Sequence, residues 1–211
     1  MVEVVVLQHA DNCGPGFVAD WAAAHDVTLK LLRPDQGENL MPLRASELNG
    51  LIILGGPQSV NDDLPWLSSE RILVRSLDQR NRPVFGICLG AQQIARAFAA
   101  GVGPLTYPQY GRTMVTNAAT GATLPVFEAH TEGITAFPGM TQTYSDELGA
   151  VQGFKYHRHL AAVQFHPELD VAAFQTIANE EGFASAPVLT EAEVAASKQL
   201  LFDELDACFA F

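Results

Sequence analysis

The sequence predicts an α/β fold with a mostly parallel central sheet flanked by helices. Two observations support this. The first half of the chain alternates short β-rich apolar runs with amphipathic stretches, which is the pattern of βα units. Some of the short runs are apolar throughout, as strands buried on both faces are. The 211 residues are 48% hydrophobic and 17% charged, which is enough apolar material for a sizeable core. Because no linker or internal repeat interrupts the chain, we expect residues 1–211 to form a single domain.

The strands of the first half are expected where β-branched or apolar residues run for four to six positions. After each run comes a Gly, a Pro or the start of a helical pattern, which marks the end of the strand. The expected strands and the residues that follow them are, in order, 2–7 before Gly14-Pro15-Gly16, 27–32 before Arg33-Pro34, 51–54 before Gly55-Gly56-Pro57, and 83–87 before Cys88. Helices are expected between and after them, at 17–25, 66–80 and 89–100.

The second half has a different pattern. Residues 101–164 show short apolar runs between Gly and Pro residues, which predicts β-hairpins added at an edge of the sheet. One more apolar strand is expected at 161–165. The chain closes with a helix whose start is marked by Thr190 and Glu193, the spacing of a capping box. Its apolar stripe is formed by Val194, Leu201, Leu205 and Cys208.

Charge and hydropathy exclude several classes of partner. The formal charge is −12 and the pI is near 4.7, so the field of the protein repels phosphates. We therefore expect no nucleic-acid partner and no anionic membrane surface. No apolar run reaches the length of about 18 residues that a membrane helix needs. Glu3 stands where a signal peptide has basic residues, so we expect a cytoplasmic protein.

The most informative segment is Gly86-Ile87-Cys88-Leu89-Gly90, between an expected strand and an expected helix. Gly-x-Cys-x-Gly at this place has the form of a nucleophile elbow with sulfur instead of a hydroxyl. The glycines permit a turn at which a Cβ would clash. Cys88 would then lie at a helix N-terminus, which favours the thiolate.

An alternative is that Cys88 is a small buried hydrophobic residue, as most free cysteines are. The flanking glycines and the strand end favour a nucleophile. Cys13, in a glycine-rich loop, and Cys208, on an apolar stripe, lack this context. We expect neither of them to act, and the three cysteines show no disulfide or metal pattern.

A base and a group that orients it are expected just after the strand at 161–165. His166 and Glu168 are one residue apart, so their side chains point to the same side of an extended chain. Pro167 keeps His166 out of the helical region. A purely structural histidine is the alternative. The expected strand ends at residues 54, 87 and 165 open onto one rim of the sheet, which favours a Cys–His–Glu arrangement.

Attack on a carbonyl also needs donors for an oxyanion. The Leu89 N–H, directly after Cys88, is a natural donor, and the loop at Gly55-Gly56 can supply a second. Gln92 lies one helical turn after Cys88 on the same face and could bind a polar substrate, although an ordinary exposed glutamine is the alternative.

Three motifs in this order, Gly-Gly-Pro-Gln-Ser (55–59), Phe-Gly-Ile-Cys-Leu-Gly-Ala-Gln (85–92) and Gln-Phe-His-Pro-Glu (164–168), resemble the class I glutamine amidotransferases. Residues 7–21 and 59–66 are most similar to the stand-alone, GMP-synthase-like members. The resemblance implies a flavodoxin-like class I glutamine amidotransferase fold with an added β-hairpin region. It implies a triad of Cys88, His166 and Glu168, with oxyanion donors at the amides of Gly56 and Leu89 and with Gln92 touching the substrate.

The resemblance also implies an activity: hydrolysis of the side-chain amide of glutamine through a Cys88 thioester, without a cofactor. The ammonia would pass to an acceptor or to a synthetase partner in trans, because the chain has no room for a synthetase domain. A γ-glutamyl peptidase or hydrolase with the same triad is the second hypothesis, and a non-catalytic binding subunit is the third. His130-Thr131-Glu132 and Gln109-Tyr110-Gly111-Arg112 depart from the usual family motifs and leave the identity of the substrate open.

His157-x-His159 could place two imidazoles on one face of a strand. No third ligand is apparent near them in the sequence, so we expect a polar surface pair and no metal site. His9, His25 and His130 receive no role from the sequence.

Overall fold

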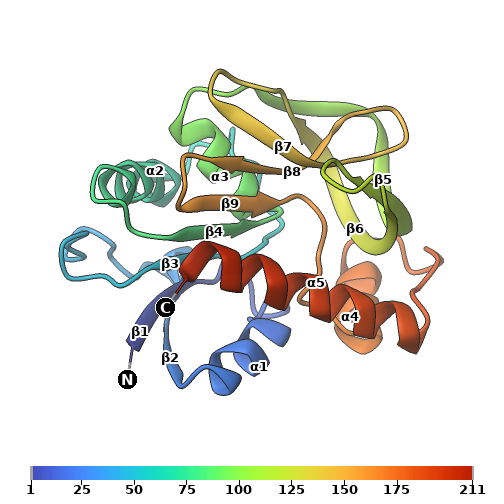
Figure 1. Cartoon of the computed structure of the whole chain (residues 1–211), viewed down its shortest axis with the longest axis horizontal. Helices are drawn as coiled ribbons and strands as arrows, with labels where there is room; N and C mark the ends of the chain where they lie inside the picture. Colours follow the sequence, from blue (N-terminus) through green and yellow to red (C-terminus); the bar gives the residue numbers. More distant parts are fainter. Residues whose placement is uncertain (1, 211) are drawn as a thin grey trace.

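The computed structural model describes residues 2–210, and its centre is one nine-stranded sheet (Figure 1). The order of the strands across the sheet is β2-β1-β3-β4-β9-β8-β6-β5-β7. The strands are β1 (Val2–Leu7), β2 (Val27–Leu32), β3 (Leu51–Ile53), β4 (Val84–Ile87), β5 (Val102–Asn117), β6 (Thr123–Ile134), β7 (Met140–Ser145), β8 (Val151–Tyr156) and β9 (Leu160–Val163).

The sheet is mixed, which corrects the expectation of a mostly parallel sheet. Strands β2, β1, β3, β4 and β9 pair in parallel, but β8 pairs antiparallel with β9. Strands β5, β6 and β7 continue the sheet with antiparallel pairings only. The reason is the length of the connections, because strands joined by short turns pair antiparallel, whereas a parallel neighbour needs a long crossover.

The antiparallel half is also larger than the short hairpins expected from the sequence. Strand β5 has 16 residues and β6 has 12, and the two pair along most of their length. The Pro and Gly residues that suggested breaks lie inside β5. The pairing tolerates them through an irregularity between Pro104 and Gln109, and Gly111 adopts a φ of +85° that favours glycine.

Helices cover both faces of the sheet. They are α1 (Phe17–Ala24), α2 (Pro65–Asp78), α3 (Leu89–Ala97), α4 (Val171–Glu180) and α5 (Glu191–Phe209), with a short 3₁₀ turn, η1 (Pro34–Gln36). Helices α1 and α5 pack on one face, and α2 and α3 pack on the other (Figure 1). The capping box at the start of α5 is confirmed, since Thr190 Oγ1 accepts from the Glu193 N–H and the Glu193 side chain accepts from the Thr190 N–H. Helix α4 was not expected from the sequence.

The glycines on both sides of Cys88 are required by packing. A Cβ on Gly90 would lie 2.0 Å from the carbonyl oxygen of Ile53, and a Cβ on Gly86 would lie 2.6 Å from the Gly90 carbonyl. Both contacts are with backbone, which cannot move aside as a flexible side chain can. Strand β4 therefore turns directly into α3 with the start of the helix pressed against β3.

Replacing Gly90 with alanine is expected to destabilise the fold by about 2 kcal/mol or more, because the added methyl group forces α3 away from β3. In an unstrained helix the same change is stabilising by up to about 1 kcal/mol, so the sign is diagnostic. Urea unfolding measures the change. Gly103→Ala is the control, since a Cβ there meets no atom within 4 Å. Equal stabilities for the two variants would contradict this packing.

Among the helices formed by residues 2–210, none is both long and apolar enough to span a lipid bilayer.

Candidate active site

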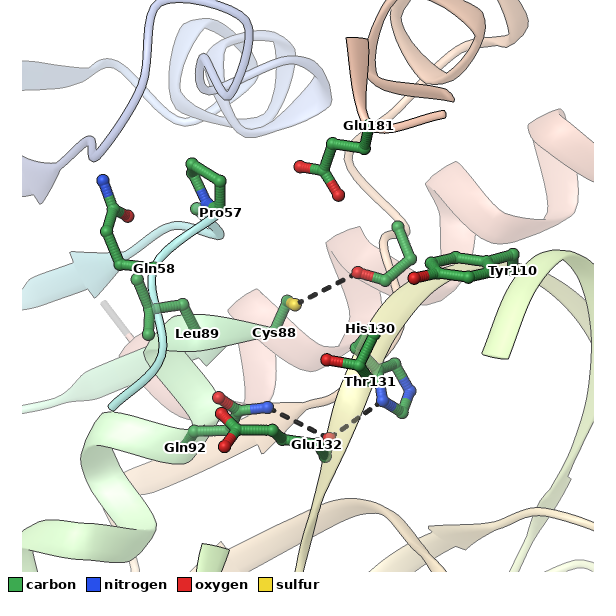
Figure 2. A pocket seen from close by; sticks show the side chains of 12 residues that line it. Pro57, Gln58, Cys88, Leu89, Gln92, Tyr110, His130, Thr131, Glu132 and Glu181 are labelled. Carbon is green, nitrogen blue, oxygen red and sulfur yellow. Dashed lines mark hydrogen bonds between the residues drawn. The ribbon is translucent and has the colours of Figure 1, made fainter. Parts of the chain in front are cut away.

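Three strand ends bring the predicted groups to one rim of the sheet. Strand β3 is followed by Gly55-Gly56, β4 by Cys88, and β9, after two further residues, by His166. Strand β9 ends at Val163, two residues earlier than expected. A pocket opens at this rim, and Figure 2 shows side chains from both halves of the sheet around it. Its lining includes Gly56, Pro57, Gln58, Cys88, Leu89, Gln92, Tyr110, Ala129, His130, Thr131, Glu132 and Glu181.

Cys88 occupies the sharp turn between β4 and α3. It caps the N-terminus of α3 with a φ of 50° and a ψ of −107°, a strained conformation for a residue with a side chain. Its N–H donates to the Val163 carbonyl at 2.9 Å, which ties the turn to β9. Its Sγ lies 3.9 Å from the Ala129 carbonyl oxygen in β6 (Figure 2). The residue is only 5% exposed and lines the pocket.

His166 joins Cys88 to Glu168. The Nδ1 atom of His166 lies 2.7 Å from Oε1 of Glu168, and the ring lies close enough to Cys88 that this residue raises the pKa of His166. Because Glu168 occupies Nδ1, the nitrogen that faces Cys88 is Nε2. All three side chains are buried.

The charge on His166 is favoured by its neighbours. Burial by itself lowers the pKa of His166, but the Glu168 carboxylate and Cys88 outweigh it, so this pKa lies well above its usual value. An imidazole in this position accepts a proton from the thiol readily and stabilises the thiolate that is left.

Backbone contacts from distant segments fix this group. The His166 N–H donates to the Phe127 carbonyl of β6 at 2.8 Å. The Phe17 N–H at the start of α1 donates to the Glu168 carbonyl at 2.9 Å, and a Cβ on Gly16 would lie 2.1 Å from the same oxygen. The Gly14-Pro15-Gly16 break seen in the sequence thus lets α1 begin in contact with Glu168.

The predicted donors and the predicted substrate contact line the same pocket. Within residues 2–210, the N–H groups of Gly56 and Leu89 donate to no protein acceptor. Gln92 is buried, and its Nε2 donates to the Glu132 carbonyl at 3.2 Å. Two unsatisfied backbone donors beside a thiol are what an oxyanion requires.

Sequence reasoning missed Glu181, from the end of α4, as part of the pocket wall, and it noted Tyr110 of β5 and Glu132 only as departures from the family motifs (Figure 2). Burial raises the pKa of the Glu181 carboxyl, and His166 opposes this shift. Glu132 accepts from Ser59 Oγ at 2.8 Å and from Asn61 Nδ2 at 3.1 Å, so it connects the antiparallel strands to the loop after β3. Only tertiary pairing brings these groups together, and no local signal identifies Glu181.

The other two cysteines have the environments of inert thiols. Burial raises the pKa of Cys13 to about 12, and the neighbouring Cys88 contributes to the same shift. Burial also raises the pKa of Cys208 to about 12. Cys208 Sγ donates to the Val84 carbonyl inside the core, in agreement with its predicted place on the apolar stripe of α5.

Iodoacetamide at pH 7 is therefore expected to alkylate Cys88 first, because a thiol with a pKa near 12 has a thiolate fraction of only about 10⁻⁵ at this pH. Peptide mass spectrometry after a time course measures the order of modification. Cys88→Ala should leave almost no fast labelling, whereas Cys208→Ala should leave it unchanged. Faster labelling of Cys13 or Cys208 would show that the thiolate is elsewhere.

The histidine pair of the β8–β9 turn does have a third group beside it, which corrects the expectation from the sequence. His157 Nδ1 and His159 Nε2 lie 2.7 and 2.9 Å from the same oxygen of Asp78, at the end of α2. Asp78 comes from a segment far away in the sequence, so no local spacing could reveal it. These hydrogen bonds give both rings an acceptor and tie α2 to the turn.

Comparison with known proteins gives concordant matches. The family model described as glutamine amidotransferase class-I matches residues 18–183. A glutamine-hydrolyzing GMP synthase subunit of Thermoplasma volcanium is 34% identical over 175 residues, which are 78% of this chain and 83% of the relative. The protein of the same description from Thermoplasma acidophilum is 36% identical over 133 residues, which are 58% of this chain and 64% of the relative.

A solved structure is also similar over the whole chain. The glutamine amidotransferase of Methylobacillus flagellatus superposes with a TM-score of 0.84 at 26% sequence identity, covering 100% of this chain and 93% of that one. The similarity therefore extends to the antiparallel half of the sheet and to both ends of the chain, beyond the residues that the family model matches.

Proposed function

This chain belongs to the class I glutamine amidotransferase family, and from that premise we propose that it hydrolyses the side-chain amide of glutamine to glutamate and ammonia through a thioester on Cys88. The observation that supports the proposal is the hydrogen-bonded pair of His166 and Glu168 beside Cys88, at a pocket lined by free backbone donors. We regard residues 1–211 as one catalytic domain.

In the first step, the Cys88 thiolate attacks the amide carbon while His166 holds the thiol proton. The S–C bond forms, and the π electrons of the carbonyl move to its oxygen, where the N–H groups of Gly56 and Leu89 stabilise the charge. The C–N bond then breaks as His166 gives its proton to the departing nitrogen, which leaves as ammonia. The product on the enzyme is a thioester of glutamate.

In the second step, His166 Nε2 takes a proton from water as the water attacks the thioester. The tetrahedral intermediate uses the same two donors, and its collapse releases glutamate and restores the thiolate–imidazolium pair. Throughout, Glu168 accepts from Nδ1, which keeps Nε2 free for the thiol and stabilises the imidazolium. Gln92 provides a polar side chain on the wall of the substrate pocket.

We propose that the ammonia passes to a second protein, which transfers it to an acceptor molecule. The two Thermoplasma relatives are named as subunits of GMP synthase, and the matched family model describes an amidotransferase. A synthetase acting in trans fits both descriptions. The acidic surface does not hinder a glutamine substrate, because glutamine carries an ammonium group as well as a carboxylate.

Turnover of glutamine by the purified chain tests this proposal. Glutamate and ammonia are expected in equal amounts, with a higher rate when the synthetase component of GMP synthase is added. A series of γ-glutamyl dipeptides is assayed in parallel. Rapid peptide cleavage without glutamine turnover would replace the proposal by a γ-glutamyl hydrolase, and no turnover of either class would indicate a non-catalytic binding protein.

A further inference from the structure

A second histidine–carboxylate pair lies at the same rim, and the mechanism above does not use it. His9 directly follows Gln8 at the end of β1, and Glu70 lies within α2. Both side chains are 0% exposed, and His9 Nε2 lies 2.8 Å from Glu70 Oε1. Trp66 stacks on the imidazole with ring centroids 5.0 Å apart. A buried ion pair is costly to desolvate, and further hydrogen bonds to its two side chains are needed to offset that cost.

The partners of His9 determine its protonation. Its Nδ1 lies 3.2 Å from the Gly55 carbonyl oxygen, which can only accept, so Nδ1 carries a hydrogen. Its Nε2 faces Glu70, whose other oxygen accepts from Gln93 Nε2 at 2.6 Å. Burial lowers the pKa of His9, but Glu70 outweighs this and raises it above the usual value. Both ring nitrogens therefore face acceptor oxygens, an arrangement that favours an imidazolium donating from both.

The hydrogen bond from His9 to the Gly55 carbonyl also fixes the direction of the Gly56 N–H. The Gly55 C=O and the Gly56 N–H belong to one peptide unit, and residues 2–210 contain no cis peptide. In a trans peptide these two groups point in opposite directions. With its carbonyl held by His9, the peptide turns the Gly56 N–H away from the His9 ring. Two glycines in succession offer little steric resistance to rotation of this peptide, so an external contact has to fix it.

We propose that His9 and Glu70 are positioning residues that hold the Gly55–Gly56 peptide with its N–H directed at the oxyanion formed over Cys88. Gly56 is wedged beside His9, since a Cβ on it would lie 2.7 Å from His9 Cβ and 3.1 Å from Leu89 Cδ2. Neither His9 nor Glu70 is among the residues that line the pocket, so the pair acts through the backbone. This inference rests on the proposed amide hydrolysis and adds the reason why the oxyanion site exists before substrate binds.

Two substitutions of His9 separate its two bonds. The amide nitrogen of asparagine can take the place of Nδ1, so His9→Asn keeps a donor for the Gly55 carbonyl and loses Glu70. The longer glutamine can place its nitrogen near Nε2, so His9→Gln keeps Glu70 and loses Gly55. If the role of His9 were only to give Glu70 a hydrogen-bond donor, His9→Gln would be the better variant. The positioning role predicts the reverse order.

The test measures kcat and KM for glutamine in both variants, together with the affinity for glutamate γ-semialdehyde. The Cys88 thiolate adds to the aldehyde carbon of this probe, and the carbonyl π electrons move to oxygen, so binding requires the oxyanion site. For His9→Gln we expect kcat to fall by about 10- to 100-fold with KM within about 3-fold, and the aldehyde affinity to fall in parallel with kcat. His9→Asn should stay within about 5-fold of the wild type in all three.

Alkylation of Cys88 by iodoacetamide forms no oxyanion, so its rate should be unchanged in both variants. Asp78→Asn, which alters the hydrogen bonds between the end of α2 and the β8–β9 turn, is the control that should leave kcat intact. Thermal unfolding checks that each variant is folded. If the wild type hydrolyses glutamine but His9→Gln equals or exceeds His9→Asn in kcat and aldehyde affinity, the positioning role is refuted alone. If the wild type neither turns over glutamine nor binds the aldehyde, the proposed function fails, and the positioning role fails with it.

Discussion

Replacing Cys88 with alanine is expected to lower kcat for glutamine hydrolysis by about 10⁴- to 10⁶-fold, the size seen when a covalent nucleophile is removed from a triad. The thioester cannot form without the sulfur, and the small pocket offers no other nucleophile positioned by a turn. The proposed oxyanion donors and the proposed substrate contact Gln92 remain in place, so calorimetric binding of glutamine should stay within about 3-fold of the wild type.

The matched control removes a different buried thiol. Cys208→Ala deletes a sulfur from the core between α5 and the sheet, far from the pocket, and kcat should change by less than about 3-fold. A Cys88→Ala variant that retains more than about one hundredth of the activity would remove the basis of the mechanism, because the reaction would then not pass through this sulfur.

The second large effect is expected for Glu168→Gln, with a loss of about 10³- to 10⁴-fold in kcat/KM. The substitution removes the carboxylate that outweighs burial and raises the pKa of His166. It also allows an amide N–H to donate to Nδ1, which moves the ring proton to Nε2. In that tautomer His166 cannot accept a proton from Cys88.

The pH profile gives this prediction a sign. His166 must be an imidazolium to protonate the leaving nitrogen, so activity falls as the pH rises through its pKa. Losing Glu168 lowers that pKa, and the alkaline limb of kcat/KM should shift to lower pH. Glu180→Gln, an exposed carboxylate at the end of α4, should alter neither the rate nor the limb by more than about 2-fold. If the alkaline limb of kcat/KM did not shift in Glu168→Gln, Glu168 would not be the cause of the raised pKa of His166.

The sequence identifies the parts of this molecule that depend on local chemistry. The glycines around Cys88, the spacing of His166 and Glu168 and the capping box at Thr190 each act within a few residues, and each has the expected geometry in the structure. The five parallel strands could be recognised because a short apolar run flanked by Gly or Pro is typical of a buried strand in an α/β protein.

What could not be predicted depends on pairings between distant segments. Glu70 lies 61 residues after His9 and Asp78 lies 79 residues before His157, so neither pair has a sequence signature. The position of His9 two residues after β1, on the rim where the other strand ends meet, is the one available signal. The sequence pattern divides the long β5 because Pro and Gly usually end a strand, whereas here the pairing with β6 accommodates them as an irregularity.

Strand β6 has a consequence for attempts to build a smaller catalyst from this protein. Two of its carbonyl groups, on Phe127 and Ala129, meet the His166 N–H and the Cys88 thiol, respectively. The parallel strands carry the reactive groups and β4 pairs directly with β9, but these two further contacts come from the antiparallel half. A truncated chain that kept β1 to β4 and β9 would thus retain the reactive side chains and lose their alignment, and a graft of the site onto another parallel scaffold would have to include an equivalent of β6.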